Sequence, residues 1–417
     1  MYTSFPIVAK ASAVALVFSV AGCARSPSNT PDAEADTVLD AASEALAPRG
    51  ADAAPPVVVD AFFPSGDRPR PDVQSVDHTG VDGADGAAPA GSPVAIHGQL
   101  QVQGTMLTDA WGDLVQLKGV SSMWLNWESK PFAESKSALA YMRDNWKLSV
   151  IRASMGTEAS RGYLTSDANQ AVMLAKVETI IGNAIELGVY VIVDWHTEKA
   201  VDQQAQSIAF FTALAEKYGN YPNLIWEPYN EPNGYTWTQV KPYHEAVVDA
   251  IRAIDPDNII VMGTTNWSQD VDIASRTPVS PASGTTNLMY ALHFYACTHG
   301  QSLRNKADVA LSSGLALFIT EFASTPSDGG VVSKGDPYVC REATNTWWNW
   351  MSANNISGVS WKLDKCTDTS CILTSDAPVD GPWTDHFLTS DLGNTYVSAG
   401  VTQGAGHGLF IVNWLRE

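Results

Sequence analysis

The sequence predicts an α/β fold, a (β/α)8 TIM barrel that is preceded by a signal peptide and a disordered linker. Eight short apolar runs alternate with stretches of helical periodicity between residues 95 and 400, and eight β/α units in about 300 residues suit such a barrel. The runs are almost continuously apolar, which is typical of parallel strands with both faces buried. A doubly wound open sheet is the alternative, but it would need a glycine-rich phosphate turn, and the sequence contains neither GxGxxG nor a Walker loop.

The first 23 residues have the pattern of a signal peptide. Lys10 is followed by the apolar run ASAVALVFSVAGC, which is too short to span a bilayer as a helix. Its last four residues, VAGC, resemble a bacterial lipobox, in which Cys23 would be lipidated. An ordinary signal peptide with an incidental cysteine is the alternative. Both interpretations predict export, either as a secreted protein or as a lipoprotein of the cell surface or outer membrane.

Residues 24–94 differ in composition from the rest of the chain. They are rich in Ala, Asp, Pro and Gly and lack a sustained apolar period. Because such a segment cannot bury a core, we predict a disordered linker there. The barrel domain is predicted to span residues 95–400, and residues 401–417 are predicted to form a C-terminal tail that packs on it.

The predicted elements follow one another in regular order. Residues 168–187 show the helical pattern, since apolar side chains recur on one face and Gly188 then ends the helix. The other predicted helices cover residues 134–146, 203–218 and 236–254. The predicted strands occupy residues 114–122, 148–154, 189–196, the beginning of the segment 223–234, and residues 258–264, 287–296, 315–322 and 356–363.

The fourth strand lies in the segment NLIWEPYNEPNG, residues 223–234, and is expected to run to Glu231 and to end at Pro232. Pro228 lies inside it and would remove one ladder donor, which predicts a local irregularity.

The composition favours a neutral partner. The net charge is −20, from 25 basic and 45 acidic residues, and such a surface repels nucleic acid and anionic lipid. The chain also contains 14 tryptophans, whose flat rings are good platforms for the faces of sugars. We expect a monomer that has no nucleic-acid partner and meets a membrane only through a lipid anchor at Cys23.

Four cysteines remain besides Cys23, an even number that predicts disulfides in an exported chain. Cys366 and Cys371 are close in sequence and are one candidate pair, which leaves Cys297 with Cys340 as the other. Three pairings are possible, and all three stay open. A metal site is the weaker interpretation, because no CxxC or HxxxH spacing is present.

Polar or aromatic residues stand at the ends of seven predicted strands, where a plain core strand would not need them. In a TIM barrel these ends meet at one mouth, where active sites form. The residues are Arg152, Asp194, Trp195, His196, Asn230, Glu231, Trp267, His293, Tyr295, Glu321 and Trp361.

Glu231 and Glu321 are candidates for an acid/base pair across this mouth. Retaining glycosidases use two carboxyl groups about 5–5.5 Å apart, one protonated and one ionised. Arg152 would hold one carboxylate ionised and Tyr295 would hydrogen-bond it, while Asn230 would hold a sugar 2-hydroxyl. The motifs of rival chemistries, HExxH for zinc hydrolysis and GxSxG for a serine hydrolase, are absent from the sequence. We therefore expect neither a metal nor a cofactor.

Eight segments in order carry a resemblance to a known family. The segment from His97 to Trp127 and the motifs VIRASMGT, VIVDWHT, YNEPNG, GTTNWSQDVD, ALHFYACTHG, FITEF and GVSWKL resemble those of bacterial cellulases of glycoside hydrolase family 5, over residues 96–397. The resemblance implies a retaining endo-β-1,4-glucanase that acts on cellulose or a related β-glucan.

On matching positions, the resemblance implies that Glu231 is the acid/base and Glu321 the nucleophile. It implies that Glu227 is a structural carboxylate inside the strand. The implied supporting polar residues are Arg152, His196, Asn230, His293 and Tyr295, the implied sugar-contacting aromatics are Trp127, Trp267 and Trp361, and Lys365 lies one residue nearer to Trp361 than the lysine often found in the family.

Two further positions depart from the family's pattern. Met123 replaces a common histidine and Gly156 a common tyrosine, and both family residues usually line the substrate site. A β-mannanase or another β-glycanase of the same fold is therefore one alternative. A non-catalytic glycan-binding barrel is another, although the presence of both glutamates with Arg152 argues against it.

Overall fold

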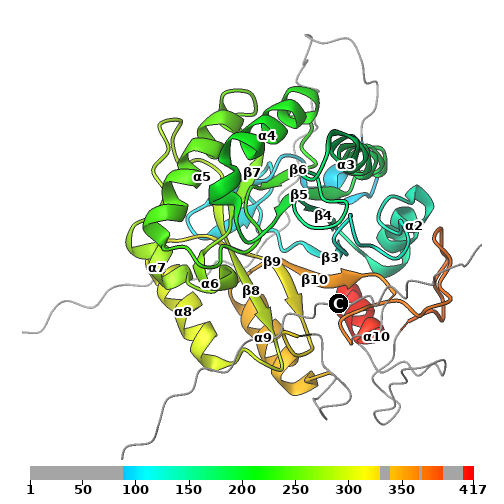
Figure 1. Ribbon diagram of the computed structural model, residues 1–417. Coiled ribbons are helices and arrows are strands. Elements are labelled where there is room, and N and C mark those ends of the chain that lie inside the picture. Colours follow the sequence, from blue (N-terminus) through cyan, green and yellow to red (C-terminus); the bar gives the residue numbers. More distant parts are fainter. Residues whose placement is uncertain (1–87, 329–338, 366–368, 388–406) are drawn as a thin grey trace, which may run out of the picture. The chain divides into compact units, whose positions relative to one another are not determined.

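The computed structural model describes residues 88–328, 339–365, 369–387 and 407–417 (Figure 1). The chain divides into two units, Met1–Ala84 and Asp85–Glu417, and the described residues belong to the second. The predicted signal peptide with Cys23, and residues 24–87 of the predicted linker, lie outside the described residues. In the part of the chain that is described, no helix has the length and apolar character needed to cross a membrane.

Eight parallel strands close into a barrel, as the sequence predicts, and the last strand pairs with the first. Each strand pairs with its neighbour in sequence, so the order around the barrel is the order along the chain. The strands are β3 (Lys118–Ser122), β4 (Val150–Gly156), β5 (Tyr190–His196), β6 (Leu224–Glu227), β7 (Ile259–Met262), β8 (Leu288–Tyr295), β9 (Leu317–Ala323) and β10 (Gly358–Leu363).

Helices surround the barrel on its outer face (Figure 1). All four predicted helices are present within a few residues of the predicted bounds, and the first continues as a π-helical turn, Met142–Trp146. The helices are α2 (Lys136–Tyr141), α3 (Asp167–Leu187), α4 (Gln204–Tyr218, after a 3-10 turn at Ala200–Gln203), α5 (Trp237–Arg252), α6 (Thr265–Ser268), α7 (Val271–Arg276), α8 (Gln301–Ser312) and α9 (Arg341–Ala353).

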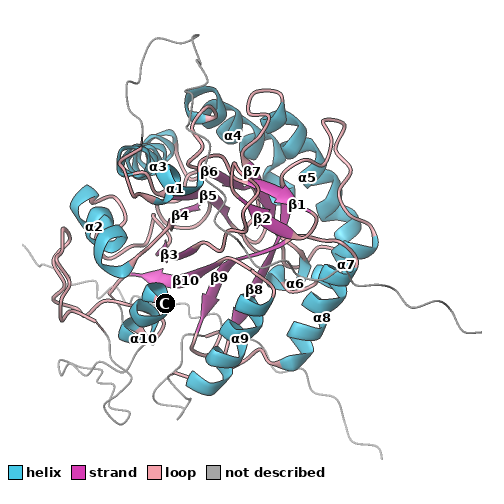
Figure 2. Ribbon diagram, turned by 180° about the vertical axis from the view of Figure 1, so that it is seen from behind, coloured by secondary structure: helices cyan, strands magenta, loops and turns pink. Residues whose placement is uncertain are grey.

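The end of the barrel opposite the mouth is closed by the segment that precedes β3. The helix α1 (Pro93–His97) and the hairpin of β1 (Gln101–Gln103) and β2 (Met106–Thr108) cover this end (Figure 2). Apolar side chains of this segment and of seven barrel strands form one core at this end. The segment contributes Val94, Leu100, Leu107, Val115 and Leu117, and the strands contribute Val150, Tyr190, Ile192, Ile225, Ile259, Val261, Met289, Ala291, Phe318 and Val359. The lower barrel is therefore a packed apolar plug, and polar groups are confined to the other end.

The last described segment packs against the outside of the barrel. Helix α10 (Gly408–Arg416) buries Ile411, Val412 and Leu415, and its Trp414 stacks on Trp348 of α9 at 5.4 Å. Burial of such side chains contributes about 1.5–3 kcal/mol each, which fixes the tail to the barrel.

One of the cysteine pairings that the sequence leaves open is present. Cys297, just after β8, is bonded to Cys340, which precedes α9. Cys371 is also disulfide-bonded, and Cys366 lies outside the described residues.

Helix α3 supports β4 and β5, two of the strands that carry polar mouth residues. Ser166 caps its beginning by accepting a hydrogen bond from the backbone of Asn169. Gly188 ends it with a left-handed φ of 67°. A Cβ at this glycine would lie 2.0 Å from the hydroxyl of Ser92, so both the backbone angle and the space require glycine.

We expect Gly188→Ala to lower the free energy of unfolding by about 1–3 kcal/mol, from the left-handed backbone angle together with the contact at Ser92. Gly182→Ala in the same helix is the matched control. A Cβ there meets nothing within 4 Å, so that change should raise stability by about 0.5–1 kcal/mol. Urea unfolding of both variants tests this, and equal effects would contradict it.

Candidate active site

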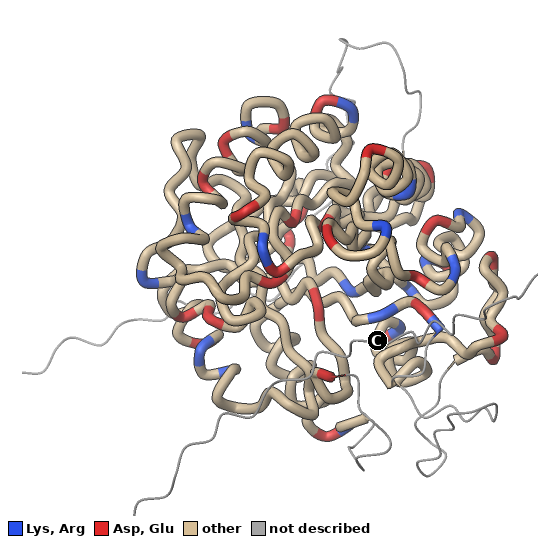
Figure 3. The backbone as a smooth tube through the Cα atoms, in the orientation of Figure 1, with Lys and Arg blue, Asp and Glu red and all other residues tan. Residues whose placement is uncertain are grey.

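The polar strand ends gather at one mouth of the barrel. Most charged positions of the described chain lie on outer helices and loops, and a smaller group lies among the strands at the centre (Figure 3). Four buried charged residues stand on the strands at this end, Arg152 on β4, Asp194 on β5, Glu227 on β6 and Glu321 on β9. Two buried histidines accompany them, His196 on β5 and His293 on β8.

Arg152 is the cation around which the group is arranged. Its guanidinium is fully buried and reaches three carboxylates: Nε lies 2.7 Å from Glu227, Nη1 2.9 Å from Glu321 and Nη2 2.9 Å from Asp194. Nη2 also donates to the side-chain oxygen of Asn230 at 2.6 Å. The planar fork of an arginine suits such multiple pairing, so four side chains from three strands and a loop are held at fixed positions.

Glu321 is held as an anion. One oxygen accepts from Arg152 and the other accepts from the hydroxyl of Tyr295 at 2.7 Å. Burial raises the pKa of Glu321, but the positive charges of His293 and Arg152 outweigh it, and the pKa lies below its usual range. The carboxylate is therefore ionised near neutral pH.

Glu231 lies in the loop after β6, and here the predicted strand end is wrong. The strand stops at Glu227, four residues before Glu231, because Pro228 has no N–H to continue the ladder. The loop instead leans on the end of β5, where the backbone N–H groups of Asn230 and Glu231 donate to Trp195 and Thr197.

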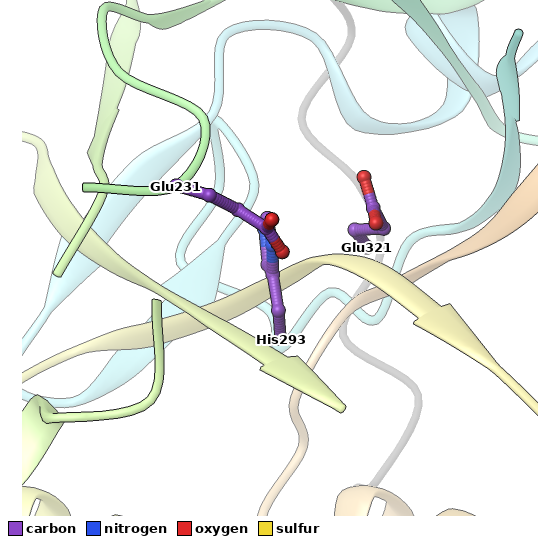
Figure 4. Close-up of side chains that lie close together, drawn as sticks. All are labelled: Glu231, His293 and Glu321. Carbon is purple, nitrogen blue, oxygen red and sulfur yellow. The ribbon is translucent and has the colours of Figure 1, made fainter. Parts of the chain in front are cut away.

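The carboxyl of Glu231 faces that of Glu321 across the mouth (Figure 4). One oxygen of each and a ring nitrogen of His293 all lie within 4.8 Å of one another. Burial, together with the negative charge of Glu321, raises the pKa of Glu231 to about 7, although its hydrogen bond to His293 opposes the shift. About 18% of the Glu231 side chain stays exposed, so an incoming molecule can reach it.

The same three residues form a group that could ligate a metal ion in the described part of the chain. Their donor atoms are already engaged, however. His293 Nδ1 lies 2.9 Å from Glu231, and both oxygens of Glu321 accept from Arg152 and Tyr295. The chemistry of this set therefore fits proton exchange between an acid and an anion.

His196 is held neutral and orients Asn230. Burial, reinforced by the charge of Arg152, lowers the pKa of His196 to about 3. Its Nδ1 bonds to Asp194 at 2.5 Å, and its Nε2 lies 3.4 Å from the amide nitrogen of Asn230. The amide oxygen of Asn230 therefore faces Arg152 and its amide nitrogen faces His196.

Aromatic rings lead from the mouth toward the surface. Trp361 stacks on His196 with ring centres 5.6 Å apart, and the edge of His196 meets Trp124 at 4.3 Å. Trp124 stacks on Trp127 at 4.8 Å, and Trp127 is 41% exposed. The sequence prediction missed Trp124, although it stands in the same motif as Trp127, because a tryptophan in a loop gives no signal of which way it faces.

Two other predicted site residues lie in loops around the mouth. Trp267 follows β7 in a left-handed stretch, and its N–H donates to Pro232 at 3.2 Å, so it adjoins the loop that carries Glu231. Lys365 follows β10 and forms an isolated bridge with Leu373. The lysine that contacts Trp361 is its neighbour Lys362, which is buried and has its ammonium 5.5 Å from the centre of the Trp361 ring.

The departure at Gly156 has a steric cause. A Cβ there would lie 2.0 Å from the side-chain oxygen of Asn126. Asn126 is buried and donates to the carbonyl of Ser160 at 3.2 Å. This asparagine therefore occupies the space in which a larger side chain at position 156 would begin.

Comparisons with known proteins agree with this geometry. The family model "Cellulase (glycosyl hydrolase family 5)" matches residues 108–366. An endoglucanase of Clostridium saccharobutylicum is 42% identical over 300 residues, which cover 70% of this chain and 63% of the relative. Endoglucanase Z of Dickeya dadantii is 44% identical over 250 residues, 59% of this chain and 55% of the relative. The chain thus spans more than half, but less than two thirds, of the length of these relatives.

Solved structures give the same result. A Thermobifida fusca endoglucanase catalytic domain, solved in complex with cellotetraose, superposes with a TM-score of 0.66 at 27% identity, covering 78% of this chain and 100% of that one. The catalytic domain of alkaline cellulase K superposes with a TM-score of 0.63 at 26% identity, covering 78% and 95%. On the family model, the relatives and the barrel together, the chain belongs to the cellulase family, glycosyl hydrolase family 5.

Proposed function

We propose that the protein is a retaining endo-β-1,4-glucanase that cleaves cellulose or a related β-glucan. The observation that carries the proposal is the facing pair Glu231 and Glu321, whose environments push their pKa values in opposite directions. Carboxyl oxygens within 4.8 Å are close to the separation of about 5–5.5 Å that retaining enzymes use, and they lie well inside the separation of about 6.5–9.5 Å that inverting enzymes use.

In the first step the ionised Glu321 attacks the anomeric carbon, and a glycosyl–enzyme ester forms as the glycosidic bond breaks. Glu231 gives its proton to the departing oxygen, which leaves as a hydroxyl. Tyr295 and Arg152 hold Glu321 in place through one bond to each oxygen. In the second step Glu231 accepts a proton from water, and the water oxygen replaces Glu321 on the sugar.

Asn230 and the aromatic rings are proposed to hold the glucan. The amide of Asn230 is oriented by Arg152 and His196, which leaves it ready to bond a sugar 2-hydroxyl. We propose that Trp127, Trp267 and Trp361, with Trp124 beside them, stack on glucose rings. The names of the two relatives, endoglucanases, and the cellotetraose complex of the T. fusca enzyme support a β-glucan as substrate.

We further propose export and a monomeric state. The support for export is the signal-peptide pattern of residues 1–23. A lipid at Cys23, in the lipobox-like ending, would tether the catalytic barrel to a membrane surface through residues 24–87. Catalysis at a surface suits a polymer that cannot enter the cell.

Glu231→Gln should lower kcat on a cellulosic substrate by about 10²–10⁴-fold through loss of the general acid, and Glu321→Gln should cost at least as much. An aryl cellobioside with a good leaving group separates the role of acid from the role of nucleophile, because the aryl group can leave without being protonated. With it, Glu231→Gln should still release one burst of the aryl group, and Glu321→Gln should not. Glu186→Gln on the exposed face of α3 is the control, and full activity in either mouth variant would contradict the proposal.

The free enzyme should show a bell-shaped dependence of kcat/KM on pH. The acidic limb lies low because the pKa of Glu321 is lowered, and the basic limb lies at or above neutrality because the pKa of Glu231 is raised to about 7. The basic limb should be absent in Glu231→Gln. A basic limb that persists in this variant would remove Glu231 from the role of acid.

A substrate panel tests the glycan. Carboxymethylcellulose and mixed-linkage β-glucan should be cleaved with a rapid fall in viscosity, which is the mark of internal cuts, and proton NMR of early products should show the β-anomer. A preference for mannan, xylan or xyloglucan would replace the proposed substrate and favour the alternative β-glycanase.

Cys23 should carry lipid when the gene is expressed in its host. Mass spectrometry should find the mature N-terminus at Cys23 with an added diacylglycerol, and Cys23→Ser should release the enzyme from the membrane fraction. A mature N-terminus at another residue would contradict the anchor and leave a secreted enzyme.

A further inference from the structure

A row of hydrogen bonds runs across the mouth beneath the catalytic pair. The hydroxyl of Thr320 lies 2.6 Å from Glu227 Oε1 and 2.8 Å from His293 Nε2. The other ring nitrogen, His293 Nδ1, lies 2.9 Å from Glu231 Oε1. The direct gap between His293 Nε2 and Glu227 is 3.8 Å, too long for a hydrogen bond. Thr320 therefore bridges the two.

Thr320 reaches this place through an irregularity in β9. On the neighbouring strand, Ala291 pairs with Phe318 and His293 pairs with Glu321, so β9 contains one residue more than β8 over the same stretch. Such a bulge breaks the alternation of side chains. Thr320 and Glu321 are neighbours in sequence, yet both bond to groups in the mouth.

Only one assignment of donors and acceptors is consistent with this row of hydrogen bonds. Burial raises the pKa of Glu227, but the effects of Arg152 and His293 are larger and lower this pKa to about 2. Glu227 is therefore ionised and can only accept hydrogen bonds. Thr320 has one hydroxyl proton and must give it to Glu227. The hydroxyl oxygen then accepts from His293, and Nε2 of this histidine always carries a hydrogen.

With Nε2 protonated, only Nδ1 of His293 can change its proton. In a neutral ring Nδ1 presents a lone pair, and a lone pair bonds to Glu231 only if the carboxyl is protonated. In a charged ring Nδ1 donates to the Glu231 carboxylate. The two residues therefore share one proton, and removing it leaves a lone pair facing a carboxylate.

We propose that Thr320 is a positioning residue that fixes the tautomer of His293 and thereby keeps a proton on the His293–Glu231 pair into the alkaline range. The proposal deepens the proposed function and rests on Glu231 being its acid/base. The raised pKa values, about 7 for Glu231 and about 9 for His293, agree with a pair that releases its last proton late. Thr320 itself is fully buried.

The charges around the pair do not depend on the Thr320 hydroxyl. Glu321 raises the pKa of both members and Glu227 raises that of His293. The titratable and charged groups that face the pair are Arg152 from β4, Asp194 and His196 from β5, Glu198 from the loop after it, Glu227 from β6, Tyr295 from β8 and Glu321 from β9. Replacing Thr320 by valine changes none of these charges and keeps the β-branched shape.

The first experiment compares the pH dependence of kcat/KM for the full chain with Thr320→Val and Thr320→Ser. In Thr320→Val, Nε2 loses its acceptor and the Nδ1–H tautomer becomes available to donate to ionised Glu231. The basic limb should therefore move to lower pH by about one unit, since a buried hydrogen bond changes such an equilibrium by about tenfold. Thr320→Ser, which keeps a hydroxyl, should keep the basic limb of the parent enzyme.

Circular dichroism and the acidic limb are the controls for folding and for Glu321, and both should match the parent enzyme. A basic limb that stays in place in Thr320→Val, or that moves equally in Thr320→Ser, would overturn the proposal.

The second experiment needs no Thr320 variant. Nitrogen-15 NMR of the parent enzyme labelled at histidine reports the tautomer, and His293→Gln identifies the signal. Above the basic limb, neutral His293 should carry its hydrogen on Nε2, and a hydrogen on Nδ1 would overturn the proposal even if Thr320→Val fails to fold. Glu231→Gln separates the failure of the proposed function from the failure of the Thr320 proposal. A basic limb that survives in this variant rejects Glu231 as the acid, whereas the tautomer of His293 decides the role of Thr320.

Discussion

The buried pairing of Arg152 with three carboxylates is the constraint on which the rest of the mouth depends. The lower barrel is an apolar plug, so these charges have little water to solvate them and must satisfy one another. Removing one member of such a cluster leaves uncompensated buried charge, at a cost of about 3–5 kcal/mol. The guanidinium therefore fixes Glu321 and Asn230 in space and, through Glu227, the row of hydrogen bonds that ends at Glu231.

Charge balance explains why two glutamates in one pocket take opposite protonation states. Four carboxyl groups, those of Asp194, Glu227, Glu231 and Glu321, surround one permanent cation, Arg152, and His293, which shares a proton with Glu231. Two carboxylates can be neutralised, and the pKa values of Glu227 and Glu321 are lowered while those of Asp194 and Glu231 are raised. Glu321 is ionised because Arg152 and the hydroxyl of Tyr295 bond its two oxygens, whereas Glu231 shares one proton with His293.

The barrel and most mouth residues could be predicted from the sequence. An apolar run that ends in a polar residue, such as Arg152, His196, His293 or Glu321, indicates both a buried strand and a polar group at its end. What could not be predicted depends on pairing between strands. The early end of β6 follows from Pro228, but the extra residue in β9 appears only when its partner is known. Strict alternation would turn Thr320 away from Glu321, so sequence reasoning had no ground for placing both in the mouth. Gly156 likewise gains its meaning only from Asn126, thirty residues earlier.

The arrangement also reconciles a strongly acidic protein with the polysaccharide partner that we propose for it. The carboxyl groups at the mouth are paired with Arg152 and His293. The side chains that lead from them to the surface are aromatic: Trp361, Trp124 and the exposed Trp127. A net charge of −20 neither attracts nor repels an uncharged glucan, so recognition of the proposed substrate would rest on ring stacking and on oriented amides such as Asn230. A strongly acidic surface favours solubility, and Glu321 and most of the Glu231 side chain are buried away from it.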